Sequence, residues 1–210
     1  MLRTMPEKNA DLHGNAPDSS PVALVIVDMI NDLELPGGDE LRDQAVAAAE
    51  RIAELKRRAK GAGIPVIYAN DNFGRWRSDF REVVDHVLRD GVRGRRLAEI
   101  LTPDDDDYFV LKPKHSAFYA TTLDTLLDYL GPSHLVLTGI TGDFCVLFTA
   151  SDAYMRDFHI HVPADCTASI SPEYTRQALD YMQRVLRADT TPSCELDLAA
   201  LRTSDGEGHS

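Results

Sequence analysis

The sequence lacks the features that mark membrane, secreted and nucleic-acid-binding proteins. No apolar run approaches the roughly 18–20 residues of a membrane-spanning helix, and the first twenty residues carry charges without the apolar stretch of a signal peptide. Basic side chains are scarce, with 22 Lys and Arg against 34 Asp and Glu and a formal net charge of −12. Such a chain repels phosphate backbones overall. We therefore expect no nucleic-acid and no membrane partner, and a cytoplasmic location.

Cysteine is also scarce. The chain has three, Cys145, Cys166 and Cys194, and an odd, scattered set of this size excludes a disulfide framework. Free thiols without a signal peptide are typical of the reducing cytoplasm. We expect Cys166 and Cys194 to be structural, which leaves Cys145 as the candidate reactive thiol.

Several common functional motifs are missing. No Gly-x-Gly-x-x-Gly follows the first apolar run, and the chain has neither a phosphate-binding Gly-x-x-x-x-Gly-Lys loop nor a Gly-x-Ser-x-Gly elbow. His159 and His161 share one face of a predicted strand, but no further ligand lies at metal-site spacing, so we expect a polar strand end there. The acidic run 104–107 predicts a solvated turn.

The sequence does contain short apolar runs that alternate with helical patterns. Strands are expected at 22–27, 64–69, 108–111, 134–138 and 159–162, with a sixth near 193–196. Helices are expected at 39–60, in parts of 79–101, at 121–130, at 143–157 and after Ser171. The alternation predicts an α/β fold, a three-layer, doubly wound, mostly parallel sheet with helices on both faces. We expect a disordered arm at 1–20, one domain at 21–200 and a flexible tail at 201–210.

Three reactive residue types follow three of the expected strands. Asp28 ends the first, Lys112 ends the third, and Cys145 comes shortly after the fourth. The active sites of such sheets lie beyond the carboxyl ends of the strands, so we expect these side chains in one crevice. A helix start and Lys112 would favour the Cys145 thiolate, and Asp28 could carry a proton to a leaving group. Backbone amides between Ile140 and Cys145 could hold an oxyanion.

Three ordered segments resemble the isochorismatase-like cysteine hydrolases, a superfamily that includes nicotinamidases and carbamoylsarcosine-type amidohydrolases. The segments are 24–32, 111–118 and 138–153, and the similarity extends over about residues 21–197. The resemblance implies a Rossmann-like fold, with Cys145 as nucleophile, Asp28 as general acid/base, and Lys112 orienting Asp28 and stabilising the thiolate. It also implies a cis peptide bond between Ile140 and Thr141, in the turn that would hold the oxyanion.

The chain departs from the family pattern at two places. Ile30 and Leu33 stand where the family usually has Gln and Phe. Nicotinamidases place an Asp and several His after the second strand to hold a metal, whereas the matching stretch 70–76 contains Asp71 and no His. A carboxylate alone is a poor transition-metal site. We therefore expect no metal, no other cofactor, and an activity other than that of nicotinamidase.

The thiol, carboxylate and amine favour a hydrolase that cleaves a C–N bond of a small amide, carbamoyl or ureido substrate through a Cys145 thioester. Two alternatives stay open: a vinyl-ether hydrolase of isochorismate type that uses Asp28 as its acid, and a catalytically silent binding member. The candidate substrate-binding residues are Asn72, Phe73, Trp76 and Phe118, with Arg75 and Arg77 for a substrate carboxylate.

The resemblance also implies a homo-oligomer, either a dimer or a tetramer. The predicted helix 143–157 carries apolar side chains on more than one stripe, including Phe144, Phe148, Tyr154 and Met155. The excess stripe must be covered either by helices of the same chain or by another subunit. A symmetric partner is the expected cover.

Overall fold

The computed structural model describes residues 19–71, 79–89 and 91–203. Most of the predicted arm (1–18) and most of the predicted tail (204–210) lie outside this part. Ser20, which was assigned to the arm, is buried, and its amide donates to the Leu130 carbonyl at 2.8 Å. Residues 201–203 belong to a helix and not to the predicted tail. The described structure thus extends a few residues beyond the predicted domain at both ends.

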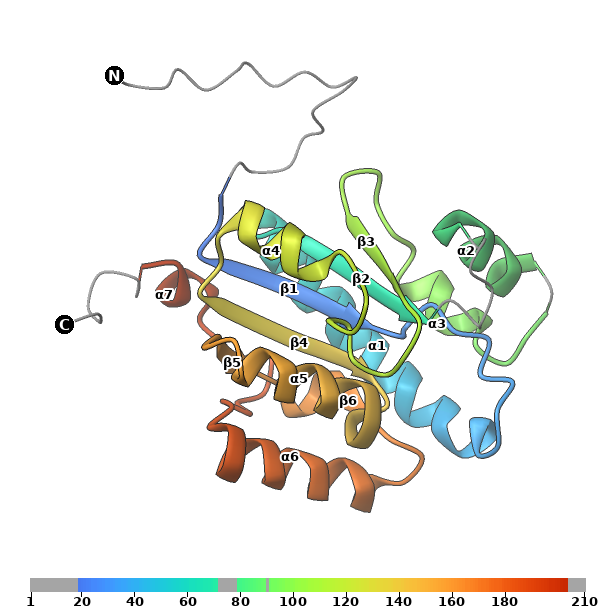
Figure 1. Ribbon diagram of the computed structural model, residues 1–210. Helices are drawn as coiled ribbons and strands as arrows, with labels where there is room; N and C mark the ends of the chain where they lie inside the picture. The colour runs from blue at the N-terminus through green and yellow to red at the C-terminus, as the bar shows by residue number, and fades with distance from the viewer. Residues whose placement is uncertain (1–18, 72–78, 90, 204–210) are drawn as a thin grey trace.

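Six strands form one sheet, and every strand pairing among the described residues is parallel. The strands are β1 (Val22–Val27), β2 (Val66–Asp71), β3 (Tyr108–Lys112), β4 (His134–Ile140), β5 (His159–His161) and β6 (Thr167–Ala168). Their order is β3-β2-β1-β4-β5, with β6 beside β4 (Figure 1). The chain thus winds outward in both directions from β1 and β4, which confirms the predicted doubly wound fold.

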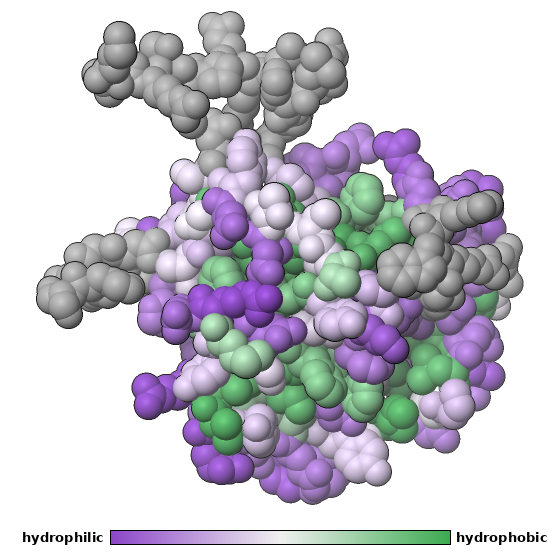
Figure 2. Space-filling model, in the orientation of Figure 1, coloured by the Kyte–Doolittle hydropathy of each residue, from purple (hydrophilic) through white to green (hydrophobic). Residues whose placement is uncertain are grey.

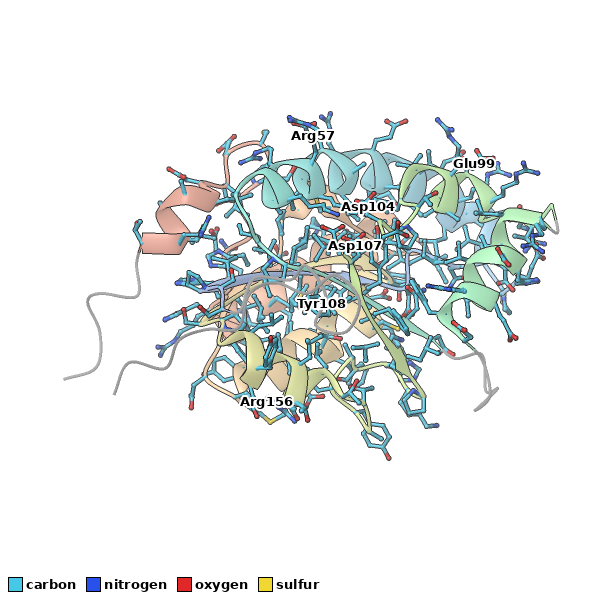
Figure 3. The ribbon with its side chains drawn as sticks, turned by 90° about the horizontal axis from the view of Figure 1, so that it is seen from above. Arg57, Glu99, Asp104, Asp107, Tyr108 and Arg156 are labelled. Carbon is cyan, nitrogen blue, oxygen red and sulfur yellow. The ribbon has the colours of Figure 1, made fainter. Side chains whose placement is uncertain are left out.

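Helices cover both faces of this sheet. They are α1 (Gly38–Gly61), α2 (Phe80–Arg89), α3 (Arg95–Ile100), α4 (Leu123–Leu130), α5 (Leu147–Tyr154), α6 (Pro172–Leu186) and α7 (Leu198–Thr203). Leu24 and Ile26 of β1 join the core under α1, α2 and α3, while Val25 joins the core under α4, α5 and α6. Figure 3 shows Arg57 on α1 and Arg156 on opposite sides of the sheet. Because β1 is buried on both faces, its sequence is a continuous apolar run.

Two of the predicted strands differ from those observed. β2 begins at Val66 and not at residue 64, because Pro65 has no N–H to donate to a ladder. The predicted strand at 193–196 is wrong. The Asp165 carboxylate accepts hydrogen bonds from the amide and the hydroxyl of Ser193, both at 2.7 Å, and these bonds hold the segment in a turn. The sixth strand is instead β6, which pairs with the end of β4.

The acidic run 104–107 is solvated only in part. The Asp107 side chain is 2% exposed and lies 2.5 Å from the Lys56 ammonium, while Lys60 bridges Asp104 and Asp106. Figure 3 places Asp104 and Asp107 between α1 and the sheet. The prediction of a plain solvated turn is therefore wrong for Asp107. A buried carboxylate needs a partner, and α1 supplies it.

A histidine pair lies at the amino-terminal edge of the sheet. His134 begins β4, and its Nδ1 atom lies 3.0 Å from Nε2 of His161 on β5. The other ring nitrogen of His161 lies 3.2 Å from the Asp189 carboxylate. His161 is thus a partly buried bridge between a second imidazole and an acid, whereas His159 is exposed. The prediction of a polar strand end therefore describes His159 but not His161, which is buried.

The pH dependence of stability is expected to reflect His161. Burial lowers the pKa of this imidazole below its ordinary 6.5, although Asp189 opposes the shift. The unfolded chain therefore binds the proton more readily, so the contribution to stability is complete above pH 6.5 and is lost as the pH falls below that value. We expect a loss of up to about 1.4 kcal/mol per pH unit from this group. Urea unfolding at pH values from 7.5 to 5 measures the free energy of unfolding. In His161→Asn this free energy should fall less steeply with falling pH, and an unchanged dependence on pH would contradict the assignment to His161.

Several large apolar side chains are exposed around α5. Phe144, Phe148, Tyr154 and Met155 are exposed, whereas Val146 is completely buried in the core of the same chain. Figure 2 shows hydrophobic side chains gathered over the lower half of this face, where Figure 1 places α5. Part of the apolar excess is thus intramolecular core, and part is surface.

Among the described residues, none of the helices has the length and apolar character needed to cross a membrane.

Candidate active site

The parallel register brings the carboxyl ends of the strands together at one edge of the sheet. Asp71 at the end of β2 pairs with Lys112 at the end of β3, and Val27 pairs with Gly139 of β4. A Cβ atom on Gly139 would lie 2.0 Å from the Val27 carbonyl oxygen, so only glycine permits this approach. As a result, the residue after β1, Asp28, lies close to the turn that carries Cys145.

Asp28 turns into this edge through its backbone conformation. Its φ angle is 53°, in the left-handed region that Asp and Asn tolerate better than most residues. Its amide donates to the Ala69 carbonyl at 2.9 Å, and its Oδ1 atom accepts from the Asp71 amide at 2.8 Å. The carboxylate is therefore held by β2 on one side while its second oxygen faces Lys112.

Lys112 links the acid to the thiol. Its side chain is fully buried, and the ammonium lies 2.7 Å from Asp28 Oδ2. It also donates to Cys145 Sγ at 3.6 Å and to the Lys114 carbonyl at 3.3 Å. An ammonium has three N–H bonds, and these three contacts account for all of them. The Cys145 thiol and the Asp28 carboxylate also influence each other electrostatically, so the predicted acid, amine and thiol lie together.

Burial dominates the electrostatics of this cluster. Burial, and then the charge of Asp28, raises the pKa of the Cys145 thiol from 9.0 to about 12, although Lys112 lowers it. Burial also raises the pKa of Asp28 against the attraction of Lys112. For Lys112, burial lowers the pKa, but the charges of Asp28 and Cys145 outweigh it and the net shift is upward. In the resting site, burial and Asp28 thus outweigh Lys112, and the net shift of the thiol pKa is upward.

Cys145 lies in a π-helical turn, η1 (Gly142–Val146), that leads into α5. The sequence predicted one regular helix over 143–157, but the amides of Phe144 and Val146 both donate to the Thr141 carbonyl, each at 3.1 Å. The preceding peptide bond, between Ile140 and Thr141, is cis. Ser169 accepts from the Asp143 amide at 3.2 Å and thereby ties the turn to the segment after β6. Turns of this type recur at functional sites.

Thr149 was missed by the sequence reasoning. Its side chain is completely buried on α5, where its hydroxyl donates to the Cys145 carbonyl at 2.7 Å and accepts from the Ala117 amide at 3.0 Å. This one hydroxyl therefore joins the turn of the thiol to the loop after Lys112. Ser116 on the same loop bonds to Asp152 of α5. The signal available in the sequence was a hydroxyl four residues after the candidate nucleophile.

Replacing Thr149 with valine is expected to destabilise the protein by about 1–3 kcal/mol, because the Ala117 amide loses a buried partner. It should also lower kcat by about ten-fold or more, since a shift of the thiol by a fraction of an ångström is costly. Thr149→Ser keeps the hydroxyl and should restore most of the activity. Steady-state kinetics on both variants checks this, and full activity in Thr149→Val would remove the residue from the site.

Of the predicted substrate-binding residues, the structure describes Phe118 alone. Phe118 is 4% exposed, and its ring packs on Phe158 and under the Arg156 guanidinium, 4.6 Å from the ring centroid. It therefore belongs to the core cluster that also contains side chains of α4 and α5, and its contact with a substrate stays a prediction. The other candidates, Asn72, Phe73, Trp76, Arg75 and Arg77, lie outside the described residues. The exposed rings of Phe144 and Phe148 instead pack on His115 beside the thiol turn.

Within the described residues, one group of three acidic side chains lies close enough to share an ion, namely Asp104, Asp106 and Asp107. Each of them is already paired with a lysine of α1, so the cluster is explained by internal ion pairs. Of the stretch 70–76, the structure describes Asn70 and Asp71, and the Asp71 amide donates a hydrogen bond to Asp28.

Comparison with known proteins gives consistent matches. A family model described as the isochorismatase domain matches residues 22–191. The uncharacterized isochorismatase family protein YaaI of Bacillus subtilis is 44% identical over 169 residues, which are 80% of this chain and 92% of that protein. The ureidoacrylate amidohydrolase RutB of Methylorubrum extorquens is 31% identical over 74% of this chain and 73% of its own length. The crystal structure of N-carbamoylsarcosine amidase from Thermoplasma acidophilum superposes with a TM-score of 0.64 at 30% identity, over 84% of this chain and 98% of that one.

Proposed function

The chain belongs to the isochorismatase family of hydrolases, and we propose that it hydrolyses a C–N bond of a small amide, carbamoyl or ureido compound through a thioester on Cys145. The observation that carries the proposal is the contact of a thiol, a buried carboxylate and a buried ammonium at the carboxyl edge of the sheet. The relatives named as amidohydrolase and amidase support the same bond type.

In the proposed reaction, the Cys145 sulfur attacks the substrate carbonyl carbon while its proton passes to Asp28. The raised pKa of Asp28 suits it to accept this proton. The tetrahedral oxyanion is held by backbone amides of the turn around the Ile140–Thr141 bond. Asp28 then protonates the leaving nitrogen, the C–N bond breaks, and a thioester remains. Water, deprotonated by Asp28, cleaves the thioester and restores the thiol.

Lys112 has a positioning and electrostatic part in this proposal. Its contact with Asp28 fixes the carboxylate, and its contact with Sγ at 3.6 Å stabilises the sulfur anion as it forms. Because the thiol pKa is about 12 in the resting site, the thiolate is generated only as the proton reaches Asp28.

The vinyl-ether alternative assigns Asp28 as the acid that protonates substrate carbon and gives Cys145 no role. The Lys112 ammonium contacts both the Asp28 carboxylate, at 2.7 Å, and the Cys145 sulfur, at 3.6 Å, and this placement of the acid beside the thiol favours the thioester route. A silent binding protein would not need the buried Lys112–Asp28 pair, since burying two charges costs more than an apolar pair of similar size.

A panel of small amides, carbamates, ureido acids and enol ethers tests the function. Release of ammonia or amine from the first three classes supports the proposal, and release of a ketone from enol ethers alone supports the alternative. The reaction is expected to proceed without a metal or other cofactor, so chelator should leave the rate unchanged.

The exposed side chains Phe144, Phe148, Tyr154 and Met155 support a homo-oligomer, which stays a prediction.

A further inference from the structure

A buried polar atom near the candidate acid has no hydrogen-bond partner. Asn70 is fully buried near the carboxyl end of β2. Its Oδ1 atom is the one buried polar atom without a partner among the side chains that the structure describes. A buried acceptor without a partner reduces stability. Folded proteins keep few such atoms, and each that they keep calls for a reason other than stability.

The other end of the Asn70 amide group contacts the turn that carries the acid. Its Nδ2 atom donates to the Ile30 carbonyl at 2.7 Å, and Ile30 lies two residues after Asp28. The residues on either side of Asn70 contact Asp28 itself. Its amide donates to the Ala69 carbonyl, and its Oδ1 atom accepts from the Asp71 amide. Three successive residues of β2 therefore hold one turn.

The Asp28 backbone requires this support. Its φ angle of 53° lies in the left-handed region, and a residue other than glycine keeps such a conformation only where its surroundings hold it. The bond from Asn70 to Ile30 fixes the direction in which the chain leaves Asp28. Without that bond the peptide groups after Asp28 can relax, and the carboxylate turns away from the Lys112 ammonium.

Asn70 approaches the turn from the face of the sheet opposite to that of Lys112. Side chains alternate along a strand, so Asn70 shares the face of Tyr68, which belongs to the core under α1, α2 and α3. Lys112 shares the face of Val110, which belongs to the core under α4, α5 and α6. Asn70 therefore acts on Asp28 without a contact to the substrate.

We infer that Asn70 is a positioning residue that keeps the Asp28 carboxylate in place by holding the Ile30 carbonyl. Its effect on turnover rests on the proposed function, whereas its effect on the thiol does not. A neutral donor suits this place, because a charged side chain would act directly on the ion pair of Asp28 and Lys112. An apolar side chain would leave the Ile30 carbonyl without this donor. The unpartnered Oδ1 accompanies the donor, as local rules of stability are broken at functional sites.

Asn70→Leu removes the donor and keeps the branching and the number of heavy atoms of the side chain. We expect kcat to fall about ten-fold or more, with KM changed by less than about two-fold because no substrate contact is lost. Iodoacetamide should alkylate Cys145 about three-fold faster or more, because Asp28 raises the thiol pKa and is displaced in the variant. Peptide mapping measures this rate against the exposed Cys194, and the buried Cys166 should stay unlabelled in folded protein.

Ser20→Ala is the matched control. The Ser20 hydroxyl also donates to a buried carbonyl, that of Val22, at 2.7 Å, but at the opposite end of β1. The control should lower the melting temperature and leave kcat and the alkylation rate unchanged. A second comparison isolates the route through Asp28. The double variant of Asp28→Asn and Asn70→Leu should be alkylated at the rate of Asp28→Asn alone, because the two changes act through one carboxylate.

Unchanged kcat in Asn70→Leu, or alkylation that is unchanged or slower, overturns the inference. Acceleration that persists in the Asp28→Asn background, or that is equal in Ser20→Ala, also overturns it, because the effect then does not pass through Asp28. If Asn70→Leu does not fold, Asn70→Ser decides by the same measurements, since its side chain is too short to reach the Ile30 carbonyl. Absence of amide hydrolysis in the unmodified protein would count against the proposed function, and the alkylation rates would then decide the role of Asn70.

Discussion

Replacing Cys145 with alanine is expected to reduce C–N hydrolysis by at least about 10⁴-fold. Loss of the nucleophile removes the covalent route and leaves only the contributions of binding and of the oxyanion turn. The fold should persist, because Cys145 is only half-buried and its sulfur fills little of the core. Measurement of amine release with the best compound of the panel, together with the melting temperature, checks both parts.

The outcome that contradicts the nucleophile assignment is equally definite. If Cys145→Ala keeps more than a few per cent of the activity, the sulfur is not the nucleophile and the vinyl-ether route gains support. Cys166→Ala is the matched control, because it also removes a free thiol, but from the buried 3₁₀ turn Ala164–Cys166 that precedes β6. It should leave turnover intact where the variant folds.

Replacing Asp28 with asparagine should have two opposite effects. Hydrolysis should fall by about 10²–10⁴-fold, because an amide cannot accept and return the proton. The Cys145 thiol should at the same time become more reactive toward iodoacetamide. Asp28 raises the thiol pKa, and without it Lys112 is left 3.6 Å from the sulfur as the only charge of the pair. Asparagine tolerates the φ angle of 53°, so the backbone should stay in place.

The alkylation gain is expected to be about three-fold for each unit by which the thiol pKa falls, because lower basicity partly offsets the larger thiolate fraction. Peptide mapping gives the rates of Cys145 and Cys194 in the same sample, and the exposed Cys194 serves as internal reference. Slower alkylation of Cys145 in Asp28→Asn would show that Asp28 does not oppose thiolate formation. Unchanged hydrolysis would remove Asp28 from the mechanism.

The position of the site was accessible from the sequence because Asp28 and Lys112 are defined by strand ends. Each follows an apolar run directly, and a parallel sheet places such residues at one edge. The doubly wound parallel fold followed from the same alternation, and the structure confirms it, although the sixth strand is β6 and not the segment 193–196. The membership in the isochorismatase family was carried by the three ordered segments, and the comparisons confirm it.

The energetics of the site were not accessible in the same way. Lys112 and a helix start suggested a stabilised thiolate, but the thiol pKa depends on how deeply Cys145 is buried and on its distance from Asp28. Neither quantity is encoded by spacing. Phe118 was assigned to the pocket because aromatic type alone does not tell a lining residue from a core residue. The Thr149 contacts and the His134–His161 pair likewise depend on which elements become neighbours.

The most direct test of the central claim is whether an acyl group is carried by Cys145. An activated ester of the best substrate's acyl group needs no protonation of its leaving group, so Asp28→Asn should be acylated by it and deacylate slowly. Intact-protein and peptide mass spectrometry after acid quench should show one acyl group on the Cys145 peptide, and none in a protein that also carries Cys145→Ala. Ester hydrolysis by the unmodified protein with no acylated Cys145 in Asp28→Asn, and at an equal rate in Cys145→Ala, would contradict the thioester mechanism.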